Sequence, residues 1–325
     1  MNDKPIEMII PTIPKDYGRV KRDLKSFFEL LPISRIVFIG PAELEDPVTA
    51  DAAEAELTDR VTFMNENDII SFKALYNAME NRIRADGYLI GENSRPGWYY
   101  QQFLKLAYAN VCGTDYYMSW DSDTIPLRRA AMFDASGRPY FDTKREYNPG
   151  YFKTIKNLFG MEKVYDQSFI SEHMLFDARL VREMTEEIEA MDLPGERFYE
   201  KIFYAIDIDN MKLGFSEFET YGTWVTVRHP DAYAFREWKS MRRTNLFTDS
   251  HDLTRDDIRW LARDYDAASF ESYHPLIPDL AELFRNKEYR RNVSAAELYQ
   301  AVVESGMFGE YVNGMIKEGD LFVSA

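Results

Sequence analysis

The sequence predicts an α/β protein in which a mostly parallel sheet is covered by helices and followed by a helical C-terminal extension. Short apolar segments alternate with helix-like segments through the first half of the chain, as in strand–helix–strand units. Of the 325 residues, 45% are hydrophobic, which is enough to fill a sizeable core. Residues 241–325 show mainly helical patterns, with capping boxes at Thr254/Asp257 and Ser294/Glu297. We therefore expect one domain over 1–240 and a helical extension over 241–325.

Compact apolar segments define the strands of the first half. We expect them at 6–11, 35–40, 60–65 and 115–120. Helices are indicated between the strands where apolar residues recur every three or four positions, as they do from Leu24 to Leu31. The same spacing predicts helices over 69–85 and 99–110. In the second helix the apolar stripe leaves Gln101 and Lys105 on the opposite side.

Turn and capping residues set the boundaries in the second half. Ser136-Gly137 predicts a hairpin between strands over 130–134 and 139–143. Asn148-Pro149 begins a helix that Gly160 ends. Asp177 caps a helix after a strand over 168–176, another helix follows over 196–206, and Ser216 with Glu219 forms a capping box.

Composition excludes several classes of protein. The chain has 39 Lys+Arg and 55 Asp+Glu, a net charge of −16, whereas nucleic-acid-binding proteins usually present a basic surface. A single cysteine, Cys112, rules out a disulfide framework and favours a reducing compartment. No apolar run approaches the roughly 18–20 residues of a membrane span, and the first residues do not form a signal peptide. We expect a cytoplasmic protein with no nucleic-acid partner and at most peripheral membrane contact.

The most informative motif is Asp121-Ser122-Asp123, which directly follows the strand predicted over 115–120. Ligands of open α/β sheets bind outside the carboxyl ends of the strands. Two adjacent carboxylates repel each other unless a cation lies between them, and oxygen ligands suit Mg²⁺ or Mn²⁺. The motif therefore predicts a metal site at Asp121 and Asp123, which would also supply positive charge for an anionic nucleotide. The alternative is a pair of solvent-facing turn aspartates, or an aspartate that caps a helix.

Several segments occur in an order that resembles one family. They are Pro11-Thr12, Gly97-Trp98-Tyr99-Tyr100-Gln101-Gln102-Phe103-Leu104-Lys105-Leu106, Trp120-Asp121-Ser122-Asp123, Ser171-Glu172-His173-Met174-Leu175-Phe176 and Phe215-Ser216-Glu217-Phe218-Glu219-Thr220-Tyr221-Gly222. Together they resemble bacterial GT-A-type glycosyltransferases, and more narrowly a DUF6492-like group found with surface-polysaccharide genes. The resemblance spans roughly residues 5–240. It implies a GT-A-like (Rossmann-like) mixed sheet flanked by helices, with a donor half over 1–126 and an acceptor half over 127–240.

The resemblance also implies an activity and a set of ligands. It indicates a metal-dependent glycosyltransferase that moves a hexosyl or related group from a nucleotide-sugar donor to a glycan or lipid-linked saccharide acceptor, in surface-polysaccharide biosynthesis. An enzyme with a lipid-linked acceptor would work at the inner face of the membrane. The donor diphosphate would lie on Mn²⁺ or Mg²⁺ at Asp121 and Asp123, beside Ser122. The other implied donor-binding residues are Pro11, Thr12, Asp68, Gln101 and Lys105.

Two of these residues have simpler interpretations, and the third metal ligand is open. Asp68 could be the N-cap of the following helix, and Lys105 could be a surface lysine. GT-A enzymes often add a histidine from the C-terminal side as a third ligand. His229 and His251 both fit that order, and we prefer His229 because it follows the helix that carries Glu217. The alternative is a histidine with a purely structural hydrogen bond.

An inverting transfer needs a carboxylate that takes the proton of the acceptor hydroxyl. The candidates are Glu172, Glu217 and Glu219. We discount Glu219 because the capping box already uses it. Glu172 lies beside His173 in an otherwise apolar strand, and such local conflicts concentrate at functional sites. Glu217 and Glu172 are therefore the predicted catalytic residues, ranked nearly level.

Two other functions compete with glycosyl transfer. A nucleotidyltransferase acting on sugar phosphates also places paired aspartates on an α/β sheet, but it normally has a glycine-rich loop after its first strand. Residues 11–15 contain no glycine. A non-catalytic nucleotide- or sugar-binding protein is the other alternative, against which the intact Asp121 and Asp123 argue.

Overall fold

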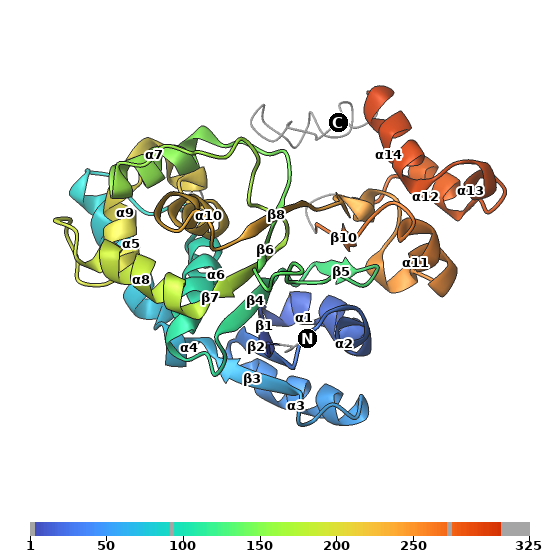
Figure 1. The fold of residues 1–325 in the computed structure, drawn as a ribbon, viewed down its shortest axis with the longest axis horizontal. Coiled ribbons are helices and arrows are strands. Elements are labelled where there is room, and N and C mark those ends of the chain that lie inside the picture. The colour runs from blue at the N-terminus through green and yellow to red at the C-terminus, as the bar shows by residue number, and fades with distance from the viewer. Residues whose placement is uncertain (1–3, 92–93, 272–274, 307–325) are drawn as a thin grey trace.

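A five-stranded mixed sheet forms the centre of the computed structural model, which describes residues 4–91, 94–271 and 275–306 (Figure 1). The strand order is β3-β2-β1-β4-β7. The strands are β1 (Ile6–Pro11), β2 (Arg35–Gly40), β3 (Val61–Asn65), β4 (Tyr116–Trp120) and β7 (His173–Asp177). All neighbours are parallel except β4 and β7, which pair antiparallel with Trp120 opposite His173. The predicted mixed sheet flanked by helices is confirmed.

Helices cover both faces of this sheet, because alternate strand residues point to opposite sides. Met8 and Ile10 face a core formed with α1 (Pro14–Val20), α2 (Leu24–Leu30) and α3 (Glu45–Glu54). Ile9 faces the larger core on the other side. The helices of that core include α5 (Phe72–Ala85), α6 (Pro96–Ala107), α7 (Pro149–Phe159), α8 (Ala178–Glu189), α9 (Phe198–Ala205) and α10 (Glu217–Arg228).

The chain forms two smaller sheets besides the central one. One has the order β5-β10-β9, and the other pairs β6 with β8. Their strands are β5 (Thr124–Pro126), β6 (Tyr140–Thr143), β8 (Ala234–Glu237), β9 (Ser240–Met241) and β10 (Ala267–Ser269). The C-terminal helices are α11 (Arg255–Leu261), α12 (Pro278–Arg285), α13 (Tyr289–Asn292) and α14 (Ala295–Glu304). They share a third core with Ile125 and Leu127 of the β5 segment.

Several elements differ from the sequence predictions. The helix expected over 69–85 begins only at Phe72, as α5, because Ser71 caps it, and a separate short helix, α4 (Glu66–Ile69), precedes it. The predicted hairpin is reduced to one bridge between Phe133 and Pro139, and β6 instead pairs in parallel with β8. The strand expected over 168–176 begins only at His173. None of the helices in the described ranges is long and apolar enough to cross a membrane.

Candidate active site

The Asp121-Ser122-Asp123 segment forms a tight turn at the carboxyl end of β4. Trp120 is fully buried, and its indole Nε1 donates a hydrogen bond to the Thr124 carbonyl at 2.7 Å. The Asp121 N–H donates to the Glu172 carbonyl at 2.9 Å, which ties the turn to the segment before β7. All three residues of the turn are partly exposed. Asp121 and Asp123 therefore lie at the carboxyl end of β4, as the sequence predicts.

Lys105 of α6 joins the turn to α10. Its Nζ lies 2.8 Å from Asp121 Oδ1 and 2.7 Å from Glu217 Oε1. The expectation that Lys105 lies on a non-core side of its helix is wrong, because α6 is buried on nearly all sides and Lys105 is 4% exposed. Burial alone would lower the pKa of Lys105, but Asp121 and Glu217 raise it overall. Lys105 is thus a fixed cation that holds two carboxylates.

Glu217 is the first residue of α10 and is buried at 4% exposure. Burial raises its pKa, while Lys105 opposes that rise. Gln102, which the sequence analysis did not select, accepts a hydrogen bond from the Glu217 N–H at 3.1 Å. It lies three residues before Lys105, so it shares a helix face with the lysine, and this spacing is the signal that could have identified it. Gln101, the predicted neighbour, is half-buried one position earlier.

Asp123 is the carboxylate of the turn whose pKa is raised by its surroundings. Partial burial, together with the carboxylates of Asp121, Glu271 and Glu172, raises its pKa to about 7. Glu271 was also missed, because it follows β10, a short strand in a region without a recognisable motif. The Phe270 N–H donates to the Asp123 carbonyl at 2.8 Å and brings this segment to the turn. A group of carboxylates that favours protonation is a set of oxygen donors that a divalent cation would stabilise.

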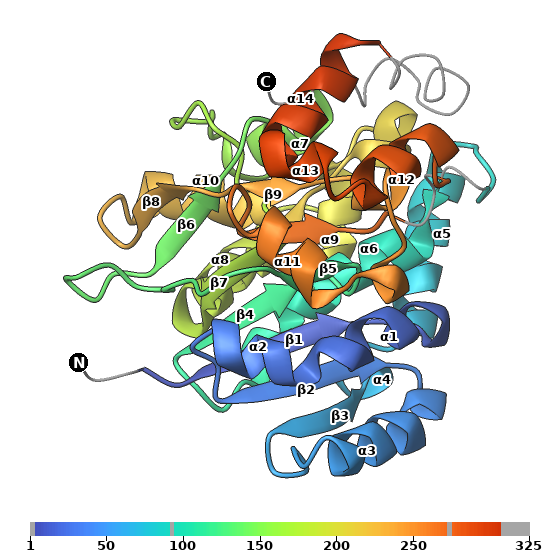
Figure 2. The ribbon, with the colours of Figure 1, turned by 90° about the vertical axis from the view of Figure 1, so that its right-hand side faces the viewer.

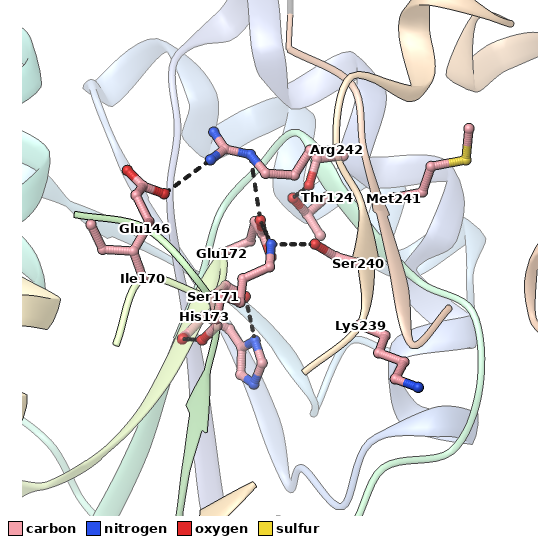
Figure 3. Close-up of polar contacts among 12 residues, drawn as sticks. Thr124, Glu146, Ile170, Ser171, Glu172, His173, Lys239, Ser240, Met241 and Arg242 are labelled. Carbon is pink, nitrogen blue, oxygen red and sulfur yellow. Dashed lines mark hydrogen bonds and ion pairs between the residues drawn. The ribbon is translucent and has the colours of Figure 1, made fainter. Parts of the chain in front are cut away.

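Glu172 lies in a second group of charges beside the turn (Figure 3). Its backbone φ of 62° is in the left-handed region, which redirects the chain just before β7. Lys144 contacts both Glu172 and the Ser240 hydroxyl. Arg242 Nε lies 3.7 Å from Glu172 Oε1, and its guanidinium also pairs with Glu146 at 3.2 Å. Glu172 Oε2 is buried and has no hydrogen-bond partner among the described residues.

His173 explains why a polar pair occurs at the start of β7. The ring is 2% exposed, lies between Trp120 and Trp238, and places Nε2 2.8 Å from Asp142 Oδ2. Asp142 also pairs with Arg236 at 2.6 Å, so this buried network is fully engaged. His173 therefore anchors the start of the strand, while the left-handed Glu172 is turned toward the charged group.

The remaining donor-side predictions have different placements. Pro11 and Thr12 lie where β1 ends, and the Thr12 N–H bonds the Ile39 carbonyl at 2.8 Å. Asp68 is exposed on α4. It is not the cap of the following helix, since Ser71 has that role. No described contact joins Asp68 to the aspartate turn.

The structure separates His229 from the other predicted metal ligands. His229 is at the C-terminal end of α10, where its Nε2 lies 3.0 Å from Glu183 Oε1 on α8. Glu217 begins the same helix, so a rise of 1.5 Å per residue places the two ends about 18 Å apart. Glu217 shares Lys105 with Asp121, which leaves His229 remote from the turn. Within the described ranges, no group of three or more His, Cys, Asp or Glu side chains is arranged to hold a metal.

Glu219 also differs from its expected role. Ser216 caps the Glu219 N–H at 3.3 Å, but the Glu219 carboxylate does not complete the capping box. It accepts from the Ser168 hydroxyl at 2.6 Å and pairs with Lys163 at 2.7 Å. Glu219 thus fixes the segment that leads to Glu172, and it remains set aside as a catalytic candidate for this different reason.

Comparisons with known proteins identify the family. Residues 6–284 match the model of a family of unknown function, DUF6492, and the chain belongs to it. No curated protein matches the chain. Mouse xyloside xylosyltransferase 1 in its apo form is similar with a TM-score of 0.44 and 12% identity, covering 84% of this chain and 99% of that one.

Two further solved structures have comparable similarity. Galactosyltransferase LgtC with donor and acceptor sugar analogues gives a TM-score of 0.43 and 13% identity, covering 88% of this chain and 95% of that one. The bifunctional glycosyltransferase WbbM in its apo form gives 0.41 and 11%, covering 92% and 52% respectively.

Proposed function

We propose that this DUF6492 protein is a GT-A-type glycosyltransferase that moves a hexosyl or related group from a nucleotide-sugar donor to a saccharide acceptor. The observation that carries the proposal is the strand-end carboxylate pair Asp121 and Asp123, of which Asp121 shares the buried Lys105 with the buried Glu217. Ligands of open α/β sheets bind at this edge. The sequence resemblance to GT-A enzymes implies that the donor diphosphate binds at the same residues, which supports the proposal.

Asp121 and Asp123 are the residues that would hold Mn²⁺ or Mg²⁺. Their carboxylate oxygens are the ligands that these ions prefer, and burial together with the neighbouring carboxylates raises the pKa of Asp123 to about 7. When bound, the metal supplies positive charge that stabilises the departing diphosphate. Lys105 holds Asp121 through Oδ1, so the orientation of that carboxylate is fixed before any ligand arrives. His229 is not part of this proposal.

Glu172 is the better of the two predicted catalytic carboxylates. Glu217 has Oε1 committed to Lys105 and its N–H to Gln102, so it serves as a positioning residue for the turn. Glu172 holds Lys144 and approaches Arg242 through Oε1, which leaves Oε2 buried and without a described partner. A buried oxygen without a hydrogen bond is costly unless a ligand completes it. Glu172 Oε2 is therefore assigned to accept the proton of the acceptor hydroxyl.

The acceptor is proposed to be a glycan or a lipid-linked saccharide of a surface polysaccharide, as the sequence resemblance implies. With a lipid-linked acceptor, the enzyme would act at the cytoplasmic face of the membrane.

A thermal-shift screen tests the donor side. UDP-, GDP-, CMP- and TDP-sugars would be added to the full chain with Mn²⁺ or with EDTA. One class of donor should raise the Tm with Mn²⁺, since a ligand at 100 times its Kd stabilises by about 2.7 kcal/mol. Asp123→Asn should abolish the shift, whereas Asp59→Asn, on an exposed residue just before β3, should keep it. No shift with any donor, or an equal shift in Asp123→Asn, would contradict the proposal.

A further inference from the structure

A cationic pocket of about 390 Å³ lies beside the candidate site. Small-molecule sites span roughly 300–1,000 Å³, so the pocket has room for a ligand. Its cationic lining residues are Arg128, Lys144, Arg145, Lys239 and Arg263. Among the described residues, only Glu237 and Asp264 add acidic side chains to the lining. This concentration of positive charge is notable on a chain whose net charge is −16.

The pocket lies where the C-terminal extension meets the domain over 1–240. Lys144 directly follows β6, Lys239 lies in the connection between β8 and β9, and Ser240 is the first residue of β9. The segment between α11 and β10 contributes Arg263. Figure 2 shows β9 between the β6–β8 pair and the C-terminal helices. The extension therefore completes a site that the first 240 residues cannot form alone.

Part of the charge in this pocket is available to a ligand. Arg128 pairs with Asp266 at 2.5 Å, and Lys144 contacts Glu172. Lys239 and Arg263 are exposed, and their side chains form no hydrogen bond or ion pair with another described residue. Figure 3 shows Lys239 extending away from Arg242 and Glu172. The acidic Asp264 is already engaged, since it accepts from the Ala296 N–H at 2.9 Å.

We propose that this pocket binds an anionic group, a phosphate or a carboxylate, carried by the acceptor saccharide. The inference rests on the proposed glycosyl transfer and adds the chemical class of its acceptor. Lys144 lines the pocket and contacts Glu172, so a ligand here lies one side chain away from the proposed base. Neutral sugars are bound by hydrogen-bonding groups and have no need of unpaired cations, whereas charged ones gain from charge-assisted hydrogen bonds.

The pocket is distinct from the place assigned to the donor diphosphate. Its lining contains neither Asp121 nor Asp123, and neither Lys105 nor Glu217. The donor and the anion should therefore bind at the same time.

Calorimetric titrations of the full chain test the proposal with three probes, glucose 6-phosphate, glucuronate and glucose. The test variant is Lys239→Gln/Arg263→Gln, and the control is Arg259→Gln/Lys287→Gln. The control removes the same charge from exposed positions outside the pocket lining, one of them on α11. We expect at least one charged probe to bind wild type and control alike, with glucose at least tenfold weaker. The affinity of the test variant for that probe should be lower by about tenfold or more. Added salt should weaken the binding of that probe to the wild type. The probe that binds identifies the anion.

Equal affinity of the charged probe for wild type and test variant would overturn the proposal. So would the absence of saturable binding of both charged probes, or displacement of the bound probe by a nucleoside diphosphate with Mn²⁺. Binding of nucleotide sugar is measured in parallel on the same proteins. If the nucleotide sugar fails to bind while the anion binds in a Lys239- and Arg263-dependent way, the proposed transfer fails and the anion site stands.

Discussion

Lys105 is the residue on which the arrangement of the carboxylates depends, because it is the cation shared by Asp121 and the buried Glu217. Removing one partner of a buried ion pair costs about 3–5 kcal/mol, since the other charge stays buried and unpaired. We expect Lys105→Met to lower the free energy of unfolding in urea by about 3 kcal/mol. Adding Glu217→Gln should recover much of that loss.

The matched control is Lys153→Met. Lys153 pairs with Asp207 but is 58% exposed, so its loss should cost no more than about 1 kcal/mol. If Lys105→Met behaves like this control, the lysine is not the cation that organises the site.

Asp123 predicts a pH dependence of stability. Its pKa in the folded protein, raised to about 7 by burial and neighbouring carboxylates, exceeds the unfolded value of 3.8. Between these values the folded state binds more protons, so the stability of the metal-free protein falls as pH rises from about 4 to 7. Asp123→Asn removes this contribution. The variant should therefore gain stability relative to wild type at pH 8, with the difference shrinking toward pH 4.

Thermal unfolding across this pH range, in EDTA, measures the effect. Asp59→Asn controls for the change in net charge. A wild type and an Asp123→Asn variant whose Tm values run parallel from pH 4 to 8 would contradict the assigned environment of Asp123.

Glu172 predicts a kinetic effect. A positioned general base contributes about 10²–10⁴-fold in rate, so Glu172→Gln should lower kcat by that order and leave nucleotide affinity nearly unchanged. Glu217→Gln should alter donor binding as well, because Glu217 shares Lys105 with Asp121. If both variants keep near-wild-type kcat, neither is the base, and a retaining mechanism becomes the better account.

At the residue scale, the sequence predicted the site residues whose positions are set by neighbouring residues in the chain. It missed the site residues that come from segments distant in sequence. Asp121 and Asp123 were identifiable because a strand ends directly before them. Glu271 follows β10, and Arg242 follows β9. These strands come to the site by pairing between distant segments, which no local sequence pattern predicts. The sequence analysis preferred His229 because it follows the helix that carries Glu217. The two residues lie at opposite ends of that helix, so His229 is far from the aspartate turn.

At the element scale, α10 positions both Glu217 and the segment that leads to Glu172. Gly222 permits this, because an added Cβ would lie 2.3 Å from the ring of Phe169. Phe169 is fully buried and packs on Phe141, so the ring cannot move away. Overpacking of a core costs about 1–3 kcal/mol, and we expect Gly222→Ala to destabilise the protein by this amount in urea unfolding.

Gly18→Ala is the control for helix propensity. Gly18 lies in α1, and nothing lies within 4 Å of the added Cβ, so this change should stabilise by up to about 1 kcal/mol. Stabilisation by Gly222→Ala would show that the contact of α10 with Phe169 is looser than described.

Whole elements were predictable to different degrees for physical reasons. β1 and β2 match their expected bounds, since a compact apolar run between turn residues has few alternatives. Asn148 and Gly160 likewise bound α7 as expected, because capping is local chemistry. β6 was assigned to a hairpin, yet it pairs with β8, where Asp142 meets Arg236 across 94 positions. Such long-range pairing is decided by the whole fold.

At the scale of the whole molecule, the C-terminal extension supports the strand that follows the aspartate turn. β10 pairs with β5 directly after the aspartate turn, and the Ser269 and Thr124 hydroxyls lie 2.9 Å apart. A chain of residues 1–240 would lack this strand and expose Ile125 and Leu127 of the third core. We expect that truncation to lose the cooperative thermal transition of the full chain. A 1–240 chain with an unchanged Tm would contradict this dependence.

The most direct test of the proposed function is donor turnover. The full chain would be incubated with the stabilising nucleotide sugar and Mn²⁺, and the released nucleotide would be quantified over time for wild type, Asp121→Asn and Asp123→Asn. Wild type should release nucleotide slowly by transfer to water and faster with an acceptor saccharide, while EDTA and both variants should abolish release. Release at the wild-type rate by Asp121→Asn and Asp123→Asn, or in excess EDTA, would contradict the account.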